Sequence, residues 1–360
     1  MNKIIDEDYK IKVGITTGDT NGIGYEIIIK ALADQRMTEI CTPIVYGSSK
    51  AASYHRKTLN ISDFNFNIIR KADQANPKKP NIVNLLEQEI KIDLGQDTVV
   101  GGEMALLSLE AAVDDLRKGQ IDVLVTAPIN KHSIRQAGFH FQGHTEYLAN
   151  RFGSDDYLML MISRNLRIGV ITGHIPLHEV PSSLSASLIS KKVKILHQSL
   201  IQDFAIPKPK IALLGLNPHA GDRGVIGTDE QTLIEPVIKT LFDEGLLVFG
   251  PYPADGFFGL GTYRQFDGVL AMYHDQGMLP FKTLSFDTGV NFTAGLPIVR
   301  TSPAHGTAYE IAGKDQASPD AFREALYFAC DILRNRAQYN ELISNPLGSD
   351  PAMRGGQTES

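Results

Sequence analysis

The sequence predicts an α/β protein of two domains. Two observations support this prediction: short apolar runs alternate with helical segments, and 360 residues are too many for one compact core. The first unit has an apolar run at residues 11–18, a glycine-rich turn at 19–24 and a helix at 25–34. Such turns are expected at the carboxyl ends of strands, where open α/β sheets bind their ligands.

The remaining segments continue the alternation. Apolar, strand-like runs are found at residues 42–48, 121–128, 156–163, 166–177, 210–221, 246–258 and 266–275. Helical patterns are found at residues 101–119, 183–201, 228–245 and 318–340. The expected helix ends are Gly119 as a C-cap, and Thr228 and Ser318 as N-caps. Residues 71–81 predict a polar surface loop, and residues 346–360 predict a flexible tail.

Composition excludes several classes of protein. The net charge is -6 with both signs spread along the chain, so no nucleic-acid partner is expected. Cys41 and Cys330 are the only cysteines, and both lie in apolar surroundings, which argues for a reducing cytoplasm rather than a disulfide framework. No apolar run approaches the roughly 18 residues of a membrane span, and the acidic N-terminus does not resemble a signal peptide.

One stretch, residues 273–313, gathers polar groups without an apolar period. It predicts a series of loops and short strands around a pocket rather than one amphipathic helix. Lys282, Asn291 and Arg300 lie in this stretch. Arginine can bind phosphate or carboxylate with two parallel hydrogen bonds, and lysine acts as a point charge. A solvated surface is the simpler explanation for such charges, but both Lys282 and Arg300 directly follow apolar residues.

Three histidines share one kind of position, because His174, His219 and His274 each follow an apolar, strand-like run. A single histidine is more often structural than a ligand. Strands of a parallel sheet end at a common edge, however, so three imidazoles there could share a divalent metal and leave a position open for substrate. The segment 143–145 precedes a helix, and its hydroxyl and amide groups could bind phosphate.

Several motifs together resemble one enzyme family. They are TAPINK (126–131), GHTEYLA (143–149), HIPL (174–177), LNPHAG (216–221), PADGFF (253–258), YHDQG (273–277) and GLPIVRTSPAHGTA (295–308). In this order they resemble the 4-hydroxythreonine-4-phosphate dehydrogenases over residues 14–318. The resemblance implies two α/β/α domains with a cleft between them, similar to isocitrate and isopropylmalate dehydrogenases. It places residues 1–135 and 305–345 in a cofactor-side domain, and residues 136–304 in a domain for metal, substrate and dimer contacts.

The resemblance also assigns roles to residues. The implied metal ligands are His174, His219 and His274. The implied substrate contacts are His144, Thr145, Lys282, Asn291 and Arg300. A segment similar to the adenine-binding segment of the related dehydrogenases supplies the implied cofactor contacts His305, Gly306, Thr307, Ala308 and Gly313. The general base is left open among Lys282, Asp255 and Asp275. The first turn departs from the family, which usually has prolines where Thr20 and Tyr25 stand here.

The implied reaction is the NAD-dependent oxidation of 4-phosphooxy-L-threonine, followed by loss of CO2, in vitamin B6 biosynthesis. NADP is the alternative cofactor, and zinc, cobalt or magnesium is the implied metal. The family acts as a homodimer that shares its metal site between subunits. Two other functions stay open: a dehydrogenase of D-threonate or D-erythronate 4-phosphate, and a non-catalytic binder of metal or phosphate on the same fold.

Overall fold

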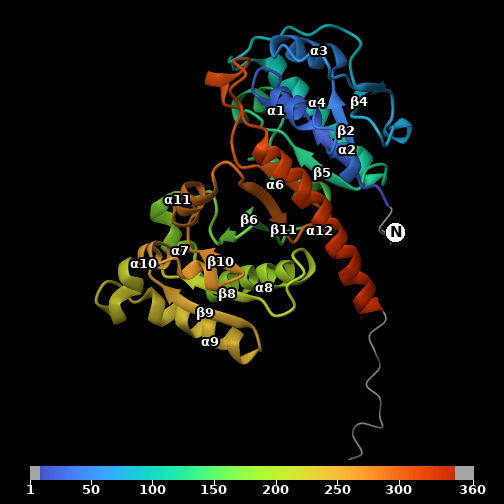
Figure 1. Ribbon diagram of the computed structural model, residues 1–360. Coiled ribbons are helices and arrows are strands. Elements are labelled where there is room, and N and C mark those ends of the chain that lie inside the picture. Colours follow the sequence, from blue (N-terminus) through green and yellow to red (C-terminus); the bar gives the residue numbers. More distant parts are fainter. Residues whose placement is uncertain (1–8, 345–360) are drawn as a thin grey trace, which may run out of the picture.

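The computed structural model describes residues 9–344, which form two lobes around one mixed sheet (Figure 1). The sheet has 12 strands in the order β3-β4-β2-β1-β5-β12-β11-β6-β7-β10-β8-β9. The strands are β1 (Lys12–Thr16), β2 (Thr42–Gly47), β3 (Asn67–Ile69), β4 (Asn81–Asn84), β5 (Val123–Thr126), β6 (Leu158–Ser163), β7 (Leu166–Val170), β8 (Lys210–Leu214), β9 (Leu247–Tyr252), β10 (Gly268–Ala271), β11 (Val290–Ala294) and β12 (Arg300–Pro303).

Helices cover both faces of the sheet. They are α1 (Gly24–Leu32), α2 (Met37–Ile40), α3 (Ser49–Thr58), α4 (Val99–Arg117), α5 (Lys131–Gln136), α6 (His144–Arg151), α7 (Val180–Ser183), α8 (Ala186–Gln202), α9 (Glu235–Asp243), α10 (Ala254–Gly259), α11 (His274–Ser285) and α12 (Asp320–Ser344). The long α12 crosses from one lobe to the other (Figure 1). No helix among residues 9–344 is long and apolar enough to cross a membrane.

The strand directions divide the sheet into three parts. The strands from β3 to β5 are parallel, as are those from β7 to β9. Between them, β12, β11, β6 and β7 pair in an antiparallel manner. The predicted α/β class with two lobes is therefore confirmed, although one sheet passes through both lobes. The domain boundaries drawn from the sequence stay a prediction.

The apolar core is continuous on one face of the sheet and divided on the other. The continuous core includes side chains of α1, α8, α9 and α12. The other face carries two separate clusters, one with side chains of α4 and α6 and one with side chains of α10 and α11. On β6, Leu158, Leu160 and Ile162 join the continuous core, whereas Met159 and Met161 alternate to the divided face. The middle of that face is left open for a cavity.

The stretch 273–313 differs from its prediction, because it opens with the helix α11 rather than with loops. Gly277, Met278 and Phe281 are the buried face of this helix. Pro280 lies within it and obscures the helical pattern in the sequence, since proline lacks the N–H that the helix would use. The rest of the stretch, with β11, β12 and a short turn at Tyr309–Ile311, matches the prediction.

The predicted helix ends are confirmed in two of three cases. Gly119 has a left-handed φ of 68° after α4, and the Ser318 hydroxyl accepts the backbone N–H of Asp320 at 3.2 Å. Thr228 does not cap α9, because a wider helical turn at Glu230–Ile234 precedes that helix. The polar segment 71–81 forms one short turn at Ala72–Gln74 before β4. The predicted tail at 346–360 lies outside the described residues.

The first turn is held by a cluster around Tyr25 instead of by prolines. The Tyr25 hydroxyl accepts the backbone N–H of Ser48 at 3.0 Å, and its ring stacks on His55 with centroids 4.9 Å apart. The His55 Nε2 in turn lies 2.9 Å from the Thr20 carbonyl oxygen. Buried aromatic stacking and hydrogen bonds therefore hold the backbone of this turn, which lacks the proline rings that are usual in the family.

Candidate active site

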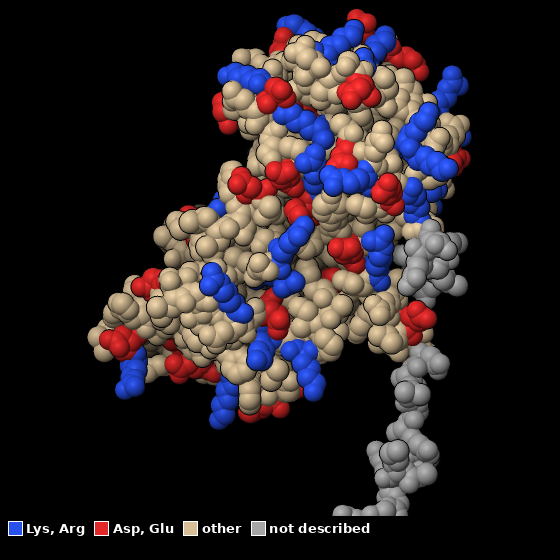
Figure 2. All heavy atoms as spheres, in the orientation of Figure 1, with Lys and Arg blue, Asp and Glu red and all other residues tan. Residues whose placement is uncertain are grey.

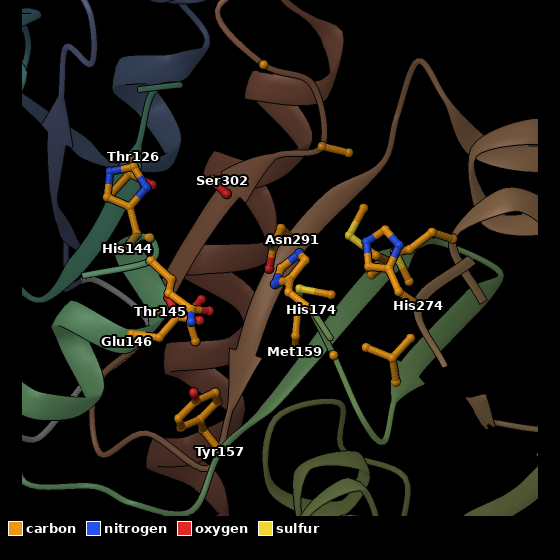
Figure 3. A pocket seen from close by; sticks show the side chains of 18 of the residues that line it. Thr126, His144, Thr145, Glu146, Tyr157, Met159, His174, His274, Asn291 and Ser302 are labelled. Carbon is orange, nitrogen blue, oxygen red and sulfur yellow. The ribbon is translucent and has the colours of Figure 1, made fainter. Parts of the chain in front are cut away.

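A cavity of about 500 Å³ lies on the divided face of the sheet (Figure 3). Its floor consists of side chains from β12, β11, β6 and β7, and its walls come from the segment between β5 and α5, the start of α6, the segment after β7, and α11. Segments more than 150 residues apart in sequence meet here, since Thr126 and Arg300 are separated by 174 positions. The cavity is therefore a product of the tertiary fold.

Arg300 is the central cation of the cavity. Its Nε and Nη2 both donate to the Thr126 Oγ1, at 3.1 and 2.6 Å, and the side chain is buried. Burial lowers the pKa of Arg300 to about 10, which still leaves it charged at neutral pH. Within residues 9–344, the only hydrogen-bond partner of this buried guanidinium is a neutral hydroxyl, which favours binding of an anionic ligand.

Three further polar atoms of cavity-lining residues are buried and have no hydrogen-bond partner in the described residues. They are the His144 Nε2, the Asn291 Oδ1 and the His305 Nε2. Burial, with the nearby charge of Arg300, holds the pKa of His144 well below its usual range, so its imidazole is neutral. Buried polar atoms normally have partners, and unpaired ones that face a cavity indicate a missing ligand. We refer to His144, Thr145, Asn291 and Arg300 as the anion end.

His174 and His274 form a second group, the histidine end. Their ring centroids are 5.1 Å apart, with the planes tilted by 39°. The His274 Nδ1 lies 2.6 Å from the Asp275 Oδ1, which leaves the other ring nitrogen of His274 available. Burial lowers the pKa of His174, and His274 and Lys131 lower it further. A carboxylate behind a histidine is the usual support of a metal ligand.

The structure places His219 apart from the other two histidines. The strands β7, β10 and β8 are parallel neighbours, as the metal prediction requires. However, His219 follows β8 on a turn with left-handed φ values, is exposed, and does not line the cavity. Within residues 9–344 of one chain, no three His, Cys, Asp or Glu side chains are grouped to hold a metal. One chain brings together only two of the three predicted ligands.

The predicted cofactor segment begins in the cavity and continues onto the first lobe. His305 and Gly306 line the cavity, and the His305 Nε2 is buried with no hydrogen-bond partner in the part of the chain that the structure describes. The Thr307 carbonyl accepts the backbone N–H of Ile23 at 3.0 Å, so the segment packs on the first turn. Ala308 and Gly313 have left-handed φ values of 45° and 73°. A Cβ on Gly306 would meet nothing within 4 Å, which leaves open space for a ligand.

The three candidate bases differ in position. Lys282 lines the cavity. Asp275 contacts His274 from outside the cavity, and its side chain is 83% exposed. Asp255, near the start of α10, is exposed and does not line the cavity. Of these three candidates, Lys282 alone lines the cavity, whereas Asp275 contacts the predicted group His274 from outside it.

Eight polar residues that line the cavity were not among the predicted site residues. They are Thr126, Lys131, Gln142, Glu146, Tyr157, Thr172, Lys192 and Ser302. Glu146 is the lone acidic side chain that lines the cavity within the described chain, opposed by the cations of Lys131, Lys192, Lys282 and Arg300. The excess of positive charge again indicates an anionic ligand. A signal for Glu146 was available, because it directly follows the predicted His144 and Thr145.

An inter-lobe cavity with excess cations, paired imidazoles and unpaired polar atoms defines an α/β enzyme of anionic small molecules. The comparisons narrow this class. The family model described as "Pyridoxal phosphate biosynthetic protein PdxA" matches residues 39–329. A 4-hydroxythreonine-4-phosphate dehydrogenase of Bacteroides thetaiotaomicron is 50% identical over 342 residues, which cover 95% of this chain and 94% of the relative. The chain belongs to the PdxA family.

Other relatives agree with this assignment. A provisionally named D-threonate 4-phosphate dehydrogenase of Cutibacterium acnes is 38% identical over 331 residues, covering 89% of this chain and 94% of the relative. The crystal structure of the Klebsiella pneumoniae 4-hydroxythreonine-4-phosphate dehydrogenase superposes with a TM-score of 0.78 at 32% identity, covering 90% of this chain and 100% of that one. All three relatives are named dehydrogenases, which supports dehydrogenase activity in this chain.

Proposed function

We propose that the protein oxidises 4-phosphooxy-L-threonine at C3 with NAD as the hydride acceptor. The C3 alcohol loses a hydride to NAD and a proton to a base, which gives a 3-oxo acid and NADH. The oxo acid then loses CO2 and takes up a proton, which gives 3-amino-1-hydroxyacetone 1-phosphate. The reaction would supply a precursor of pyridoxal 5'-phosphate, and the proposed location is the cytoplasm.

The observation that carries the proposal is the arrangement of the anion end beside the histidine end. Arg300 is buried and donates to Thr126. The His144 Nε2 and Asn291 Oδ1 are buried without partners in the described residues, and Figure 3 shows these two side chains in the cavity. A phosphate would complete the hydrogen bonding of the donor groups at this end. The alcohol to be oxidised would then lie toward His174 and His274.

His174 and His274 would hold a divalent metal ion, with zinc, cobalt or magnesium as the candidates. The donor set fits zinc or cobalt better than magnesium, because imidazole nitrogens suit the former and oxygen ligands the latter. The ion would supply Lewis acidity that lowers the pKa of the substrate alcohol. The third ligand in this proposal is His219 of a second copy of the chain.

Exposed apolar side chains support a homodimer at this place. Leu177, Val225 and Leu279 are 69%, 79% and 69% exposed, and each lies within six residues of one of the three histidines in sequence. Leu260 and Phe286, also on the second lobe, are 85% and 62% exposed. A second copy of the chain that packed on these side chains would bury them, and this is the support that they give to a homodimer. The side of the molecule shown in Figure 2 carries interspersed charges of both signs.

The chain's own residues would bind and orient the substrate and take its proton. Arg300, His144 and Thr145 would fix the phosphate, so that C3 points toward the imidazole pair. Lys282 is the proposed base, because it is the one candidate of the three that lines the cavity. The segment from His305 to Gly313 would hold the adenine side of NAD, with NADP as the alternative. Two observations support this role: the buried His305 Nε2 has no hydrogen-bond partner within residues 9–344, and there is open space beside Gly306.

A second candidate is the dehydrogenation of D-threonate 4-phosphate, which the Cutibacterium acnes relative favours. That substrate has a hydroxyl where 4-phosphooxy-threonine has an amine. Both substrates carry the phosphate that the anion end would bind, so Arg300 would have the same phosphate-binding role in the two reactions.

Measuring NADH formation with each substrate tests the proposal. Purified protein would be assayed with 4-phosphooxy-L-threonine, D-threonate 4-phosphate and D-erythronate 4-phosphate, with NAD or NADP, and with or without a chelator. We expect the highest kcat/KM with 4-phosphooxy-L-threonine and NAD, and loss of activity in chelator. A higher kcat/KM with D-threonate 4-phosphate would transfer the proposal to that substrate. No turnover of any substrate would refute dehydrogenase function, and activity unaffected by chelator would refute the metal.

A further inference from the structure

Two consecutive lysines of α8, Lys191 and Lys192, have different surroundings. Lys191 forms an ion pair with Asp156 and does not line the cavity. Lys192 lines the cavity, where its Nζ donates to the Tyr157 carbonyl oxygen at 2.5 Å and lies 5.3 Å from the centre of the Tyr157 ring. Among residues 9–344, no carboxylate forms an ion pair with Lys192. The two side chains thus provide a natural comparison between a paired and an unpaired cation.

The surroundings of Lys192 favour binding of an anion. An ammonium group has three N–H donors, and the Tyr157 carbonyl accepts only one of them. Burial lowers the pKa of Lys192, and the neighbouring charge of Lys191 lowers it further, while Asp156 opposes the shift. A partly buried cation without a bonded counterion is unfavourable unless a ligand supplies the charge. Its remaining donors are therefore available to a ligand in the cavity.

The neighbouring Tyr157 hydroxyl adds a neutral donor. Burial raises the pKa of Tyr157, and the nearby Glu146 carboxylate raises it further, so the hydroxyl keeps its proton at neutral pH. Figure 3 shows Tyr157 below Thr145 and Glu146, while His274 lies at the opposite side of the view. Tyr157 lines the cavity together with Thr145 and Glu146, so it lies next to the anion end.

We propose that Lys192 and Tyr157 extend the anion end into a phosphate subsite, with Lys192 as its second positive charge and as a determinant of specificity for phosphorylated substrates. A phosphate monoester carries a charge of about -1.5 to -2 at pH 7, more than Arg300 alone neutralises. Two of the guanidinium nitrogens of Arg300 already donate to Thr126. This inference rests on the proposed function, because that function supplies the phosphorylated substrate.

Inorganic phosphate tests the subsite directly. Its binding to the full-length wild-type protein, Lys192→Met and Lys191→Met would be measured by isothermal titration calorimetry in phosphate-free buffer. We expect Lys192→Met to weaken phosphate binding about tenfold to 100-fold, as for loss of a charged hydrogen-bond partner. Lys191→Met removes the same charge one residue away and should stay within about twofold of wild type. Equal phosphate affinities of the two variants would overturn the subsite.

Kinetics separate this role from a structural one. With 4-phosphooxy-L-threonine, Lys192→Met should raise KM about as much as it weakens phosphate binding and leave kcat within about threefold. Lys192→Arg, which keeps the charge and guards against misfolding of the methionine variant, should retain most of the phosphate affinity. A fall in kcat without a change in KM would overturn the inference. If wild-type protein oxidises no substrate but Lys192→Met still loses phosphate binding, the proposed function fails and the subsite stands.

Discussion

The two ends of the cavity differ in how complete they are within one chain. At the anion end, Arg300, Thr126 and His144 come from distant segments and are buried together. At the histidine end, two imidazoles are in contact, their supporting Asp275 is 83% exposed, and His219 lies elsewhere on the surface. The difference teaches that the fold of one chain can assemble the groups of one end while it leaves a predicted group of the neighbouring end outside the cavity.

Breaking the histidine end should have the largest effect. We expect His174→Ala and His219→Ala each to lower kcat/KM about 1,000-fold, since each removes a proposed metal ligand. If the site is shared, a mixture of the two variants, unfolded and refolded together, should recover about a quarter of wild-type activity. Random pairing makes half of the dimers mixed, and each mixed dimer contains one intact site.

Each variant refolded alone is the control for this mixing experiment. Absence of recovery in the mixture, with both variants folded and dimeric by light scattering, would show that one chain supplies all of its own ligands. The proposed difference between the two ends, that the histidine end is incomplete within one chain, would then be wrong.

Changing the anion end should have the next largest effect. We expect Arg300→Lys to lower kcat/KM about 100-fold, mainly through KM, because lysine cannot donate to Thr126 and to a phosphate with the same planar fork. Steady-state kinetics with the phosphorylated substrate measures this loss. Arg167→Lys is a control: Arg167 is half-buried, with its guanidinium over the Phe204 ring, and it does not line the cavity. A similar loss in both variants would point to general destabilisation.

The support of His274 should matter less than the ligands themselves. Asp275→Asn keeps the size of the side chain and removes the charge that faces the His274 Nδ1 at 2.6 Å. We expect metal affinity to fall about tenfold, as for other carboxylates behind metal-bound histidines. Competition with a chromogenic chelator measures the affinity. The exposed Asp287→Asn serves as the control, and unchanged affinity in Asp275→Asn would remove Asp275 from the site.

The smallest expected effect is on the pH dependence of stability, to which the buried imidazole of His144 at the anion end contributes. The pKa of His144 is well below 6.5 in the folded protein, whereas an unfolded chain titrates near 6.5. The unfolded state therefore binds more protons as pH falls below about 6.5, and folded protein loses stability there, by about 1.4 kcal/mol per pH unit at most. Urea unfolding at pH 7.5 and 5.5, without phosphate, should show that His144→Gln loses less stability than wild type.

The matched control for this pH measurement is His140→Gln, at an exposed position four residues away. His140→Gln should lose as much stability between the two pH values as wild type. If His144→Gln also behaves as wild type does, the imidazole of His144 is accessible to water in solution and the anion end is less enclosed than the fold indicates.

The sequence predicted the fold class and much of the cavity, for identifiable reasons. Alternation of apolar runs and helices predicted the strands, and β7, β10 and β8 are the parallel neighbours that the histidine argument required. The family resemblance identified His144, Thr145, Asn291 and Arg300, which the structure brings into one cavity. Periodicity alone could not have paired Arg300 with Thr126, because that contact depends on the order of strands in the sheet.

Other features could not be obtained from local patterns. Pro280 concealed the helix α11, since a proline inside a helix is rarely tolerated. The position of His219 depends on a run of five residues, His219 to Arg223, in left-handed conformations. Four of the five are not glycine, and no propensity predicts such a run. The sequence does contain an indication of the position of Lys192. Ile189, Val193 and Leu196 are buried on α8, so helical spacing places Lys192 at the edge of the buried face, whereas its opening onto a cavity required the tertiary structure.

The undivided core on one face of the sheet limits how the lobes can move. The apolar side chains of α12 and α8 hold both lobes together along that face, and no comparable layer crosses the cavity side. A change in the angle between the lobes must then bend β12, β11, β6 and β7. The helices on the face with the continuous core would keep their contacts during this motion. Amide hydrogens in the buried turns of α12 should consequently exchange slowly whether the cavity is wide or narrow, and those bordering the cavity should report its opening.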